Sequence, residues 1–437
     1  MKSFASLSLA ATAFIGTVAA ATSGSLSLLT INVAGLPDIL QGNDVPGDKE
    51  VNARQIGTYF AQYNYDIINM QEDFNYHAHI YATDNHEYRT ATSGGVPFGD
   101  GMNTVSNHWW FDFRRIKWNV CSNTDSADCL TPKGFTFMRV HVDEGVSVDV
   151  YNLHADAGTT AKDLEARASN IQQVADYIST WSEGNAVIVM GDTNTRYSRT
   201  GDNIRVLASQ NDLSDAWIVR ERNGVVPTQE SLCSNPSLVN NCEIVDKILY
   251  RGNDVFSLDA TYFNYESSKF LQPDGNILTD HNPITVDLAW KSSNTRRQSD
   301  FHGGPHGNWF NDISSLGNNP KTSVITFRGA SRVDSVGLTL ASGTKFVHGG
   351  NGGSEVSLQL GSSEYWTSVR LCQGKFNNTT RIFYIQATTS TGRTLASGTL
   401  SGECVTYTAP SGWQIVGYSG QSVNEVDLLS VIYAPQV

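Results

Sequence analysis

The chain has 437 residues, 40% hydrophobic and 17% charged, and a formal net charge of −13 at pH 7. At roughly 150 residues per domain, this length excludes a single ordinary core. The acidic charge is concentrated in residues 22–290, which carry −17 from 18 basic and 35 acidic residues. Because Lys and Arg supply most of the non-specific affinity for nucleic acids, this balance argues against a long polyanion as the preferred partner. It leaves a nuclease open, since metal ions can neutralise carboxylates locally.

The first residues have the pattern of an export signal. Lys2 precedes an apolar run from Phe4 to Ala20, and small residues with an A-x-A pattern follow at 19–21. This predicts a signal peptide over residues 1–21 and a secreted, extracellular protein. The run is too short to span a bilayer, and no later stretch of the sequence is long enough either.

Export determines how the cysteines are interpreted. An oxidising compartment favours disulfides over metal thiolates. The spacing suggests three local pairs, although spacing alone leaves other connectivities open: Cys121 with Cys129, Cys233 with Cys242, and Cys372 with Cys404.

Residues 22–290 alternate short apolar strands with amphipathic helices, which predicts a mixed α/β domain. In chain order, we expect a strand at 27–33, a helix at 49–63, strands at 66–70 and 146–153, a helix at 161–181 and a buried strand at 186–190.

A change of pattern follows this domain. The polar run KSSNTRRQ begins at Lys291 and lacks apolar periodicity, so we expect a linker over residues 291–300. Residues 301–437 are rich in Gly, Ser and Thr, with alternating runs at 323–327, 355–360 and 381–387. This predicts a second, all-β domain.

Polar residues lie at or just after the predicted strands of the first domain, where a rigid scaffold can direct them to one place. Singly, each is most often a turn or cap residue. Together they offer oxygen ligands that suit Mg²⁺ or Ca²⁺ and a histidine with an orienting carboxylate for general-base chemistry. They are Asn32, Glu72, His154, Asp192, Asn194, Asp246, Asp280 and His281.

As an ordered set, these residues resemble the endonuclease/exonuclease/phosphatase superfamily, also called deoxyribonuclease I-like. The likeness covers nearly all of residues 25–290 and implies an α+β four-layer sandwich. Within the superfamily, the chain is similar to secreted neutral sphingomyelinases of the phospholipase C type. The similar motifs are NVAGLP, EDFN, NLHADAG and the cysteine loop CSNTDSADCLTPKGF. The loop discriminates best, because nothing in the shared chemistry requires it.

The resemblance implies a site for Mg²⁺ or another divalent cation. Glu72 and Asn32 would hold the ion against a non-bridging phosphate oxygen, where it acts as a Lewis acid. Asp280 would either bind a second ion or support its loop.

The resemblance also implies how protons move. His281 would take the proton from the attacking water, with Asp246 orienting its ring and Asp192 positioning the water. Asn194 and His154 would stabilise charge in the transition state.

Two aromatic segments have open interpretations. Phe74 and Asn75 would either line a headgroup pocket, as the resemblance suggests, or serve in the core and a turn. Trp109, Trp110 and Phe111 would either dip into a lipid interface or alternate between the core and rim of a strand.

The second domain resembles the jacalin-type β-prism lectins over residues 301–435. The similar segments are GGPHGNWFND, RGASRVDSVGLTL, HGGNGG and SGQSVNEVDLLSV. The resemblance implies a sugar site made by Gly304 with Asn424 and Asp427. In the family's G-x-x-x-D sugar loop, this chain has Val423 in place of the glycine. A module that only binds protein or stabilises the chain is the alternative.

These observations predict a secreted, metal-dependent phosphodiesterase that acts on a phospholipid, of the sphingomyelinase C type. The lectin-like module would bind glycans, and peripheral membrane contact is expected. A nuclease or phosphatase is the alternative within catalysis. A carbohydrate-binding protein with a catalytically inactive first domain is the alternative outside it.

Overall fold

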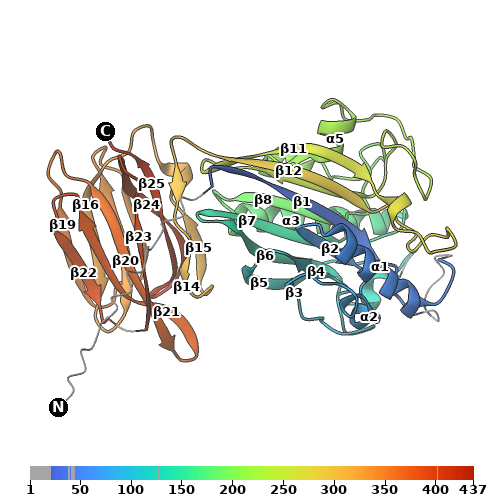
Figure 1. The fold of residues 1–437 in the computed structure, drawn as a ribbon, viewed down its shortest axis with the longest axis horizontal. Coiled ribbons are helices and arrows are strands. Elements are labelled where there is room, and N and C mark those ends of the chain that lie inside the picture. The colour runs from blue at the N-terminus through green and yellow to red at the C-terminus, as the bar shows by residue number, and fades with distance from the viewer. Residues whose placement is uncertain (1–20, 38–39, 41–44, 126, 401) are drawn as a thin grey trace, which may run out of the picture.

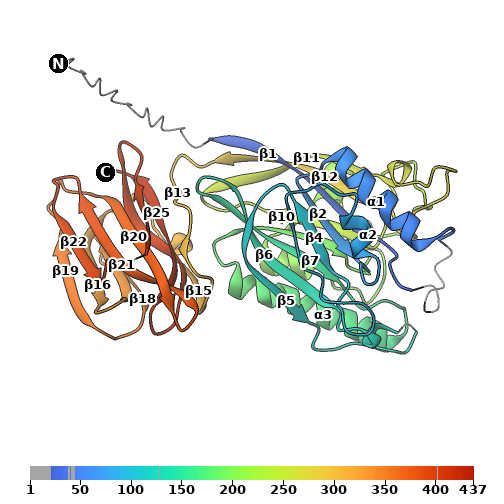
Figure 2. The ribbon, with the colours of Figure 1, turned by 60° about the horizontal axis from the view of Figure 1, so that its bottom comes forward.

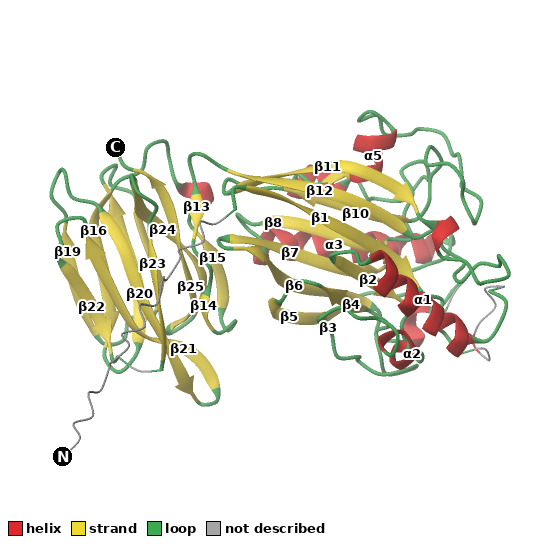
Figure 3. Ribbon diagram, in the orientation of Figure 1, coloured by secondary structure: helices red, strands yellow, loops and turns green. Residues whose placement is uncertain are grey.

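The computed structural model describes residues 21–437 except 38–39, 41–44, 126 and 401. Of the predicted signal peptide, only Ala21 lies within the described residues. The chain forms two domains joined end to end (Figure 1). The predicted mixed α/β domain followed by an all-β domain is confirmed. Figure 3 shows long helices in the first domain and strands throughout the second.

The first domain is built from two packed sheets of six strands each. One sheet has the order β11 (Phe256–Tyr265), β12 (Ile284–Ser292), β1 (Ser23–Asn32), β2 (Ile67–Gln71), β4 (Asn103–Ser106) and β3 (Tyr88–Arg89). The other has the order β5 (Trp110–Lys117), β6 (Gly134–Asp143), β7 (Val146–His154), β8 (Ala186–Asp192), β10 (Asp246–Arg251) and β9 (Ser214–Asp215).

Helices cover the outer faces of both sheets. Figure 2 shows α1 and α3 on opposite sides of them. The α-helices within the described residues are α1 (Lys49–Tyr63), α2 (His77–Tyr81), α3 (Ala161–Trp181), α4 (Val206–Asn211) and α5 (Ala216–Glu221). The bounds of α1 and α3 coincide with the predicted helices at 49–63 and 161–181, because both have clear apolar periodicity and both begin after a capping side chain, Asp48 or Thr160.

The alternation of residues along β1 explains how one strand serves two interfaces. Leu29 and Ile31 pack under α1, whereas Leu26 and Leu28 pack between the sheets. Because side chains alternate along a strand, the next residue facing the second sheet at the end of β1 is Asn32. The polar end of β1 is therefore directed between the two sheets.

Strand register brings the other polar residues to the same edge. β7 and β8 are parallel neighbours, with His154 opposite Asp192. β10 runs antiparallel to β8, with Asp246 opposite Asp192. The ends of β1, β7 and β8 thus meet the start of β10 at one edge of the sandwich.

The second domain contains three sheets of four or five strands. The first consists of β13 (Arg297–Gln298), β14 (His302–Gly303), β15 (Asn308–Asn311), β24 (Trp413–Ser422) and β25 (Val426–Pro435). The second consists of β16 (Thr322–Gly329), β17 (Val333–Leu340), β18 (Lys345–Gly349) and β19 (Ser354–Gln359). The third consists of β20 (Trp366–Phe376), β21 (Thr379–Thr389), β22 (Thr394–Gly398) and β23 (Glu403–Thr408).

The two domains make specific contacts. The Arg139 guanidinium stacks on the Trp309 ring at 3.6 Å, and Gln421 donates to Asp112 at 2.5 Å. The Gly145 N–H donates to Asp300 at 2.8 Å. The predicted linker at 291–300 is partly strand. Its first two residues belong to β12, which ends at Ser292, and β13 begins at Arg297.

The aromatic run at 109–111 lies at this domain boundary. Phe111 contacts Phe301 at 5.3 Å between ring centroids, and Trp109 stacks on His141 at 4.6 Å. The run therefore belongs to the rim of β5 beside the second domain and offers no lipid-facing surface at the catalytic edge.

All three suggested disulfides are present: Cys121–Cys129, Cys233–Cys242 and Cys372–Cys404. The first two disulfides close loops of about ten residues, and each contributes a little under 3 kcal/mol in the chain-entropy account. Of the helices in the described ranges, none has the length and hydrophobicity needed to cross a membrane.

Candidate active site

Five of the eight predicted catalytic and metal-binding residues line one cavity of about 310 Å³ at the edge where β1, β7 and β8 end: Glu72, His154, Asp192, Asn194 and His281. Asn32 and Asp246 contact His281 and complete the cluster. Asp280 is exposed on the same loop as His281.

Hydrogen bonds hold the loop that carries His281 against the end of β1. Thr279 Oγ1 donates to the Asn32 carbonyl at 2.6 Å and accepts from the His281 N–H at 3.1 Å. Residues more than 240 positions apart in the sequence are thereby fixed relative to each other. The loop is an ordered part of the site.

His281 and Asp246 form a hydrogen-bonded pair. His281 Nδ1 lies 2.8 Å from Asp246 Oδ2, and Nε2 lies 3.4 Å from Asn32 Nδ2. Burial acts to lower the pKa of His281, but Asp246 and then Asp192 raise it, and the net pKa lies well above the ordinary histidine value. When the ring is neutral, Nδ1–H donates to Asp246, which leaves the Nε2 lone pair free to accept a proton.

The other side of the cavity contains a lysine that the sequence interpretation missed. Lys133 Nζ lies 3.1 Å from His154 Nε2 and forms an ion pair with Asp128. Burial acts to lower the pKa of Lys133, but Asp128 and Glu72 raise it above the ordinary value. The available signal was the KGF that ends the discriminating cysteine loop.

His154 remains neutral beside this lysine. Burial, followed by the charge of Lys133, lowers the pKa of His154 to about 3. An ammonium can only donate, so Nε2 accepts from Lys133. His154 Nε2 also lies 3.4 Å from Asp192 Oδ2, so the lysine and the carboxylate approach the same ring nitrogen.

Glu72 fits a hard-cation ligand. It has a left-handed backbone with φ of 56°, and a side chain on Gly35 would place its Cβ 2.4 Å from the Glu72 carbonyl oxygen, so glycine permits the close approach. Burial raises the pKa of Glu72, Lys133 opposes this, and Asp280 adds to it. A cation would stabilise the charged form of such a half-buried carboxylate.

Asn32 is a suitable second ligand. Its side chain hydrogen-bonds to Glu72, and Asn32 Oδ1 accepts from the Ala34 N–H at 3.0 Å while keeping a second lone pair. Ligand atoms of Asp192, Asp246 and His281 also lie within 4.8 Å of one another. Because His281 already pairs with Asp246, its geometry suits proton transfer better than metal ligation.

The cavity has apolar walls beside its polar floor: Leu36, Leu40, Phe74, Ala127, Leu130 and Ala157. Phe74 is buried and lines the cavity, as one of the two interpretations expected. Asn75 is exposed, and its side chain accepts from the Val96 N–H at 3.4 Å in a neighbouring loop. Asn75 is not among the residues that line the cavity.

The structure places the predicted sugar-binding residues of the second domain together. Gly304 N–H donates to the Asp427 carbonyl at 2.8 Å, in a loop beside Asn424 and the exposed Val423. The Asp427 carboxylate, however, is 3% exposed and ion-paired with Arg381 at 2.8 Å. A sugar hydroxyl would therefore compete with Arg381 for this carboxylate.

Comparisons with known proteins agree with the division of the chain into two domains. Residues 48–218 match the model of "Endonuclease/Exonuclease/phosphatase family 2", and residues 299–432 match "Jacalin-like lectin domain". A protein named sphingomyelinase from Mycobacterium bovis is 36% identical over 294 residues, covering 65% of this chain and 56% of that protein. A protein of the same name from Mycobacterium tuberculosis matches equally. The chain thus spans about half the length of these curated relatives.

Two solved structures are among those that match part of the chain. Sphingomyelinase C from Streptomyces griseocarneus is 17% identical, with a TM-score of 0.42, 60% of this chain covered and 99% of that one. A mannose-binding jacalin-related lectin from Ananas comosus is 20% identical, with a TM-score of 0.28, 32% of this chain covered and 96% of that one. Residues 48–218 are thus similar to the endonuclease/exonuclease/phosphatase family 2, and residues 299–432 are similar to the jacalin-like lectin domain.

Proposed function

We propose that this protein is a secreted, divalent-metal-dependent phosphodiesterase that hydrolyses a phospholipid of the sphingomyelin type. The observation that carries the proposal is that Glu72 and His281, which pairs with Asp246, line one cavity together with an apolar wall. The polar floor suits hydrolysis of a phosphodiester, and the wall suits the apolar part of a lipid.

The residues of the site divide the chemistry between them. His281 Nε2 takes a proton from the attacking water while Asp246 holds Nδ1–H and stabilises the imidazolium that forms. The water oxygen bonds to phosphorus as the bond between phosphorus and the lipid alkoxide breaks, and solvent water protonates the departing alkoxide. The Asp192 carboxylate accepts a hydrogen bond from that water and orients it.

Asn194 and the Lys133–His154 pair provide donors and positive charge for the phosphoryl oxygens, where negative charge develops. A divalent cation held by Glu72 and Asn32 supplies Lewis-acid stabilisation of the same charge when bound.

The apolar wall and the charge distribution favour a lipid over DNA. A zwitterionic headgroup has no net charge, so the −17 on residues 22–290 repels it little. A nuclease or a phosphatase remains the alternative within the same chemistry, and a catalytically inactive carbohydrate-binding protein is the alternative outside it.

A substrate comparison tests the lipid assignment. With Mg²⁺, the full chain should hydrolyse sphingomyelin vesicles at concentrations that leave duplex DNA and a soluble phosphomonoester intact. Lowering the salt should not rescue DNA cleavage, because the unscreened field of an acidic domain repels a polyanion over about 30 Å at 0.01 M salt. DNA cleavage that outpaces lipid hydrolysis and accelerates as salt falls would establish the nuclease alternative.

Support for secretion comes from the predicted signal peptide and the three disulfides. We also propose that the second domain binds glycans through Gly304, Asn424 and Asp427, as its family match suggests. On this view, Arg381 must release Asp427 when a sugar binds. A glycan array probed with the full chain and with Asp427→Asn would test this role, and identical binding by both proteins would exclude this sugar site.

A further inference from the structure

His281 lies in an irregular segment, unlike the two carboxylates that it faces. Asp192 ends β8 and Asp246 begins β10, so the hydrogen bonds between these strands fix both backbones. His281 precedes β12, which begins at Ile284. The position of its imidazole therefore depends on the contacts that hold residues 279–282.

The loop 233–242 contacts this segment on the side that precedes His281. Asn235 Nδ2 donates to the Thr279 carbonyl at 2.9 Å. Thr279 Oγ1 in turn accepts from the His281 N–H at 3.1 Å. Thr279 is buried, so these hydrogen bonds are shielded from water. A single residue thus connects the loop to the backbone of the proposed base.

Asn282 makes the contact on the other side of His281. Its Oδ1 accepts from the Ser237 N–H at 3.0 Å and from Ser267 Oγ, and its Nδ2 donates to the Ser234 carbonyl at 3.0 Å. Asn282 is 5% exposed, and leaving its buried amide unpaired would be costly. These hydrogen bonds therefore fix the residue that follows the histidine.

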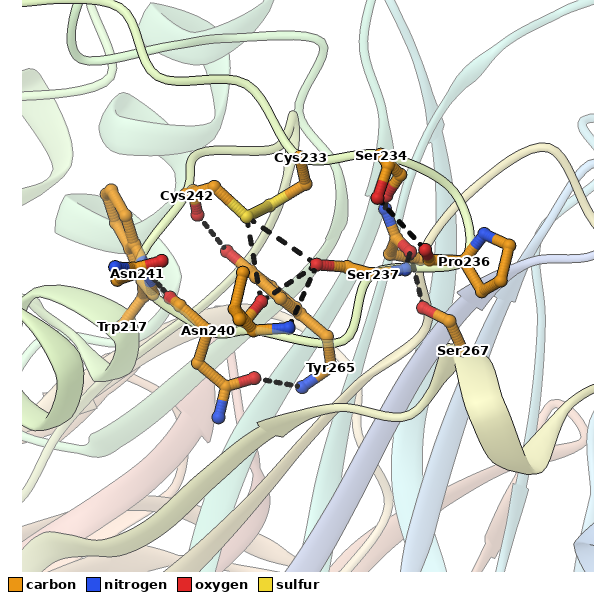
Figure 4. The surroundings of a disulfide bond; sticks show 12 residues. Trp217, Cys233, Ser234, Pro236, Ser237, Asn240, Asn241, Cys242, Tyr265 and Ser267 are labelled. Atoms are coloured by element: carbon orange, nitrogen blue, oxygen red, sulfur yellow. Dashed lines mark hydrogen bonds between the residues drawn. A yellow bond between two sulfur atoms is a disulfide. The ribbon is translucent and has the colours of Figure 1, made fainter.

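The loop is itself fixed to the core of the domain (Figure 4). The Cys233–Cys242 disulfide closes it. Trp217 Nε1 donates to the Asn240 carbonyl at 2.7 Å, and Tyr265 Oη donates to the Cys242 carbonyl at 2.8 Å. Both aromatic side chains are buried. The loop therefore joins the core to the segment that carries the proposed base.

The same loop leads into the strand that carries the partner of His281. Cys242 precedes Asp246 by four positions, and Asp246 is the first residue of β10. His281 Nδ1 lies 2.8 Å from Asp246 Oδ2. One closed loop therefore contacts the chain on both sides of this hydrogen-bonded pair.

We propose that the disulfide-closed loop 233–242 positions His281 for proton transfer and that Asn282 is a positioning residue in this role. The inference rests on the proposed phosphodiesterase function of the cavity. A misplacement of about 1 Å can cost on the order of a hundredfold in rate, so a loosened base is a slower one. Cys233, Cys242 and Asn282 are not among the residues that line the cavity, so replacing them leaves its own side chains in place.

Amide hydrogen exchange of the full chain tests the bracing independently of activity. In Asn282→Ala, and in the double variant Cys233→Ser/Cys242→Ser, the backbone amides of residues 279–282 should exchange about tenfold faster or more, because the segment opens locally. Mass spectrometry of peptides that span this segment would measure the change.

Two matched controls separate bracing from a general loss of stability. Asn211 is a buried asparagine whose Nδ2 donates to the Ala175 carbonyl at 3.1 Å, away from the cavity. The Cys372–Cys404 disulfide joins β20 to β23 in the second domain. Asn211→Ala and Cys372→Ser/Cys404→Ser should leave exchange at residues 279–282 and turnover of a soluble phosphodiester unchanged.

Kinetics on a soluble phosphodiester tests the catalytic consequence. Asn282→Ala and Cys233→Ser/Cys242→Ser should each lower kcat by about tenfold to a hundredfold and leave KM nearly unchanged, because the substrate contacts remain. In a His281→Ala background, the same changes should cause little further loss of kcat. A double-mutant cycle shows such non-additivity when one residue acts through another.

The outcomes separate this role from the catalytic proposal. Unchanged exchange at residues 279–282 in both variants would overturn the bracing, whatever the activity. An unchanged kcat, or an equal further loss in the His281→Ala background, would overturn positioning through His281. Faster exchange in the variants of a protein that hydrolyses no phosphodiester would support the bracing and overturn the proposed function.

Discussion

Replacing His281 with Ala should lower kcat on a soluble phosphodiester by a hundredfold to about ten-thousandfold, the range typical of a lost general base. The imidazole is the group in the cavity whose second nitrogen is held by a carboxylate, Asp246, at 2.8 Å. Steady-state kinetics at saturating Mg²⁺ would measure the loss. A variant that keeps more than a tenth of the activity would show that another group accepts the proton.

The pH profile gives this prediction a second readout. His281 has a raised pKa, so its neutral form increases as pH rises through that value, and kcat/KM should rise over the same interval. Asp246→Asn removes the carboxylate that raises the pKa of His281 most. The rise of kcat/KM with pH should therefore move to lower pH and reach a lower plateau.

The same shift has a stability consequence. A raised folded-state pKa stabilises the fold below the unfolded value of about 6.5, and this contribution is lost as pH rises through the folded value. His281→Ala should therefore cost more stability at pH 5 than at pH 9.

His348 is the matched control. The His348 side chain is 17% exposed, close to the 18% of the His281 side chain. It hydrogen-bonds to Asp312 at 2.7 Å in the second domain. His348→Ala removes a comparable His–Asp pair outside the cavity. It should leave kcat unchanged, and a fall comparable to that of His281→Ala would attribute the loss to the fold.

Replacing Glu72 with Gln should raise the Mg²⁺ concentration needed for half-maximal activity about tenfold or more, because one hard ligand loses its charge. Folding should be little affected. Burial already opposes the charged form of Glu72, and Gln has the same shape. Metal titration of activity, together with thermal unfolding in chelator, separates the two effects. Full activity of the unaltered protein in excess chelator would refute metal dependence.

Two further variants sharpen the metal test. Glu266 is a buried glutamate outside the cavity, paired with Lys269 at 2.9 Å. Glu266→Gln should lower stability and leave the metal requirement unchanged.

Asp280→Asn tests whether Asp280 binds a second ion or supports its loop. A changed metal requirement would indicate a second ion. An unchanged metal requirement with lower stability would indicate loop support.

The local sequence pattern was sufficient to predict many of the helices and strands. The helices at 49–63 and 161–181 have the predicted bounds because an amphipathic period and a capping residue are both local properties. Strand bounds differ by a few residues. β1 begins at Ser23, four residues before the predicted strand, because its first residues pair with β12 and lack an apolar pattern of their own.

The order of motifs also indicated which residues would meet. Asn32, Glu72, His154, Asp192 and Asn194 each end or follow a strand, and the ends of neighbouring strands converge on one edge of a sheet. His281 lies in the loop just before β12. What the pattern could not supply was the partner of each residue, since partners depend on how the two sheets and their loops pack.

The sequence by itself determined the two-domain division, the strand and helix pattern and the order of the polar motifs, because each depends on neighbours within a few residues. Only the tertiary structure decided that Lys133 reaches His154, that Arg381 occupies Asp427, and that Trp109 lies at the domain boundary. These contacts join residues that are 21 to 46 positions apart, and such a contact is set by packing and register, to which the local hydrophobic period is insensitive.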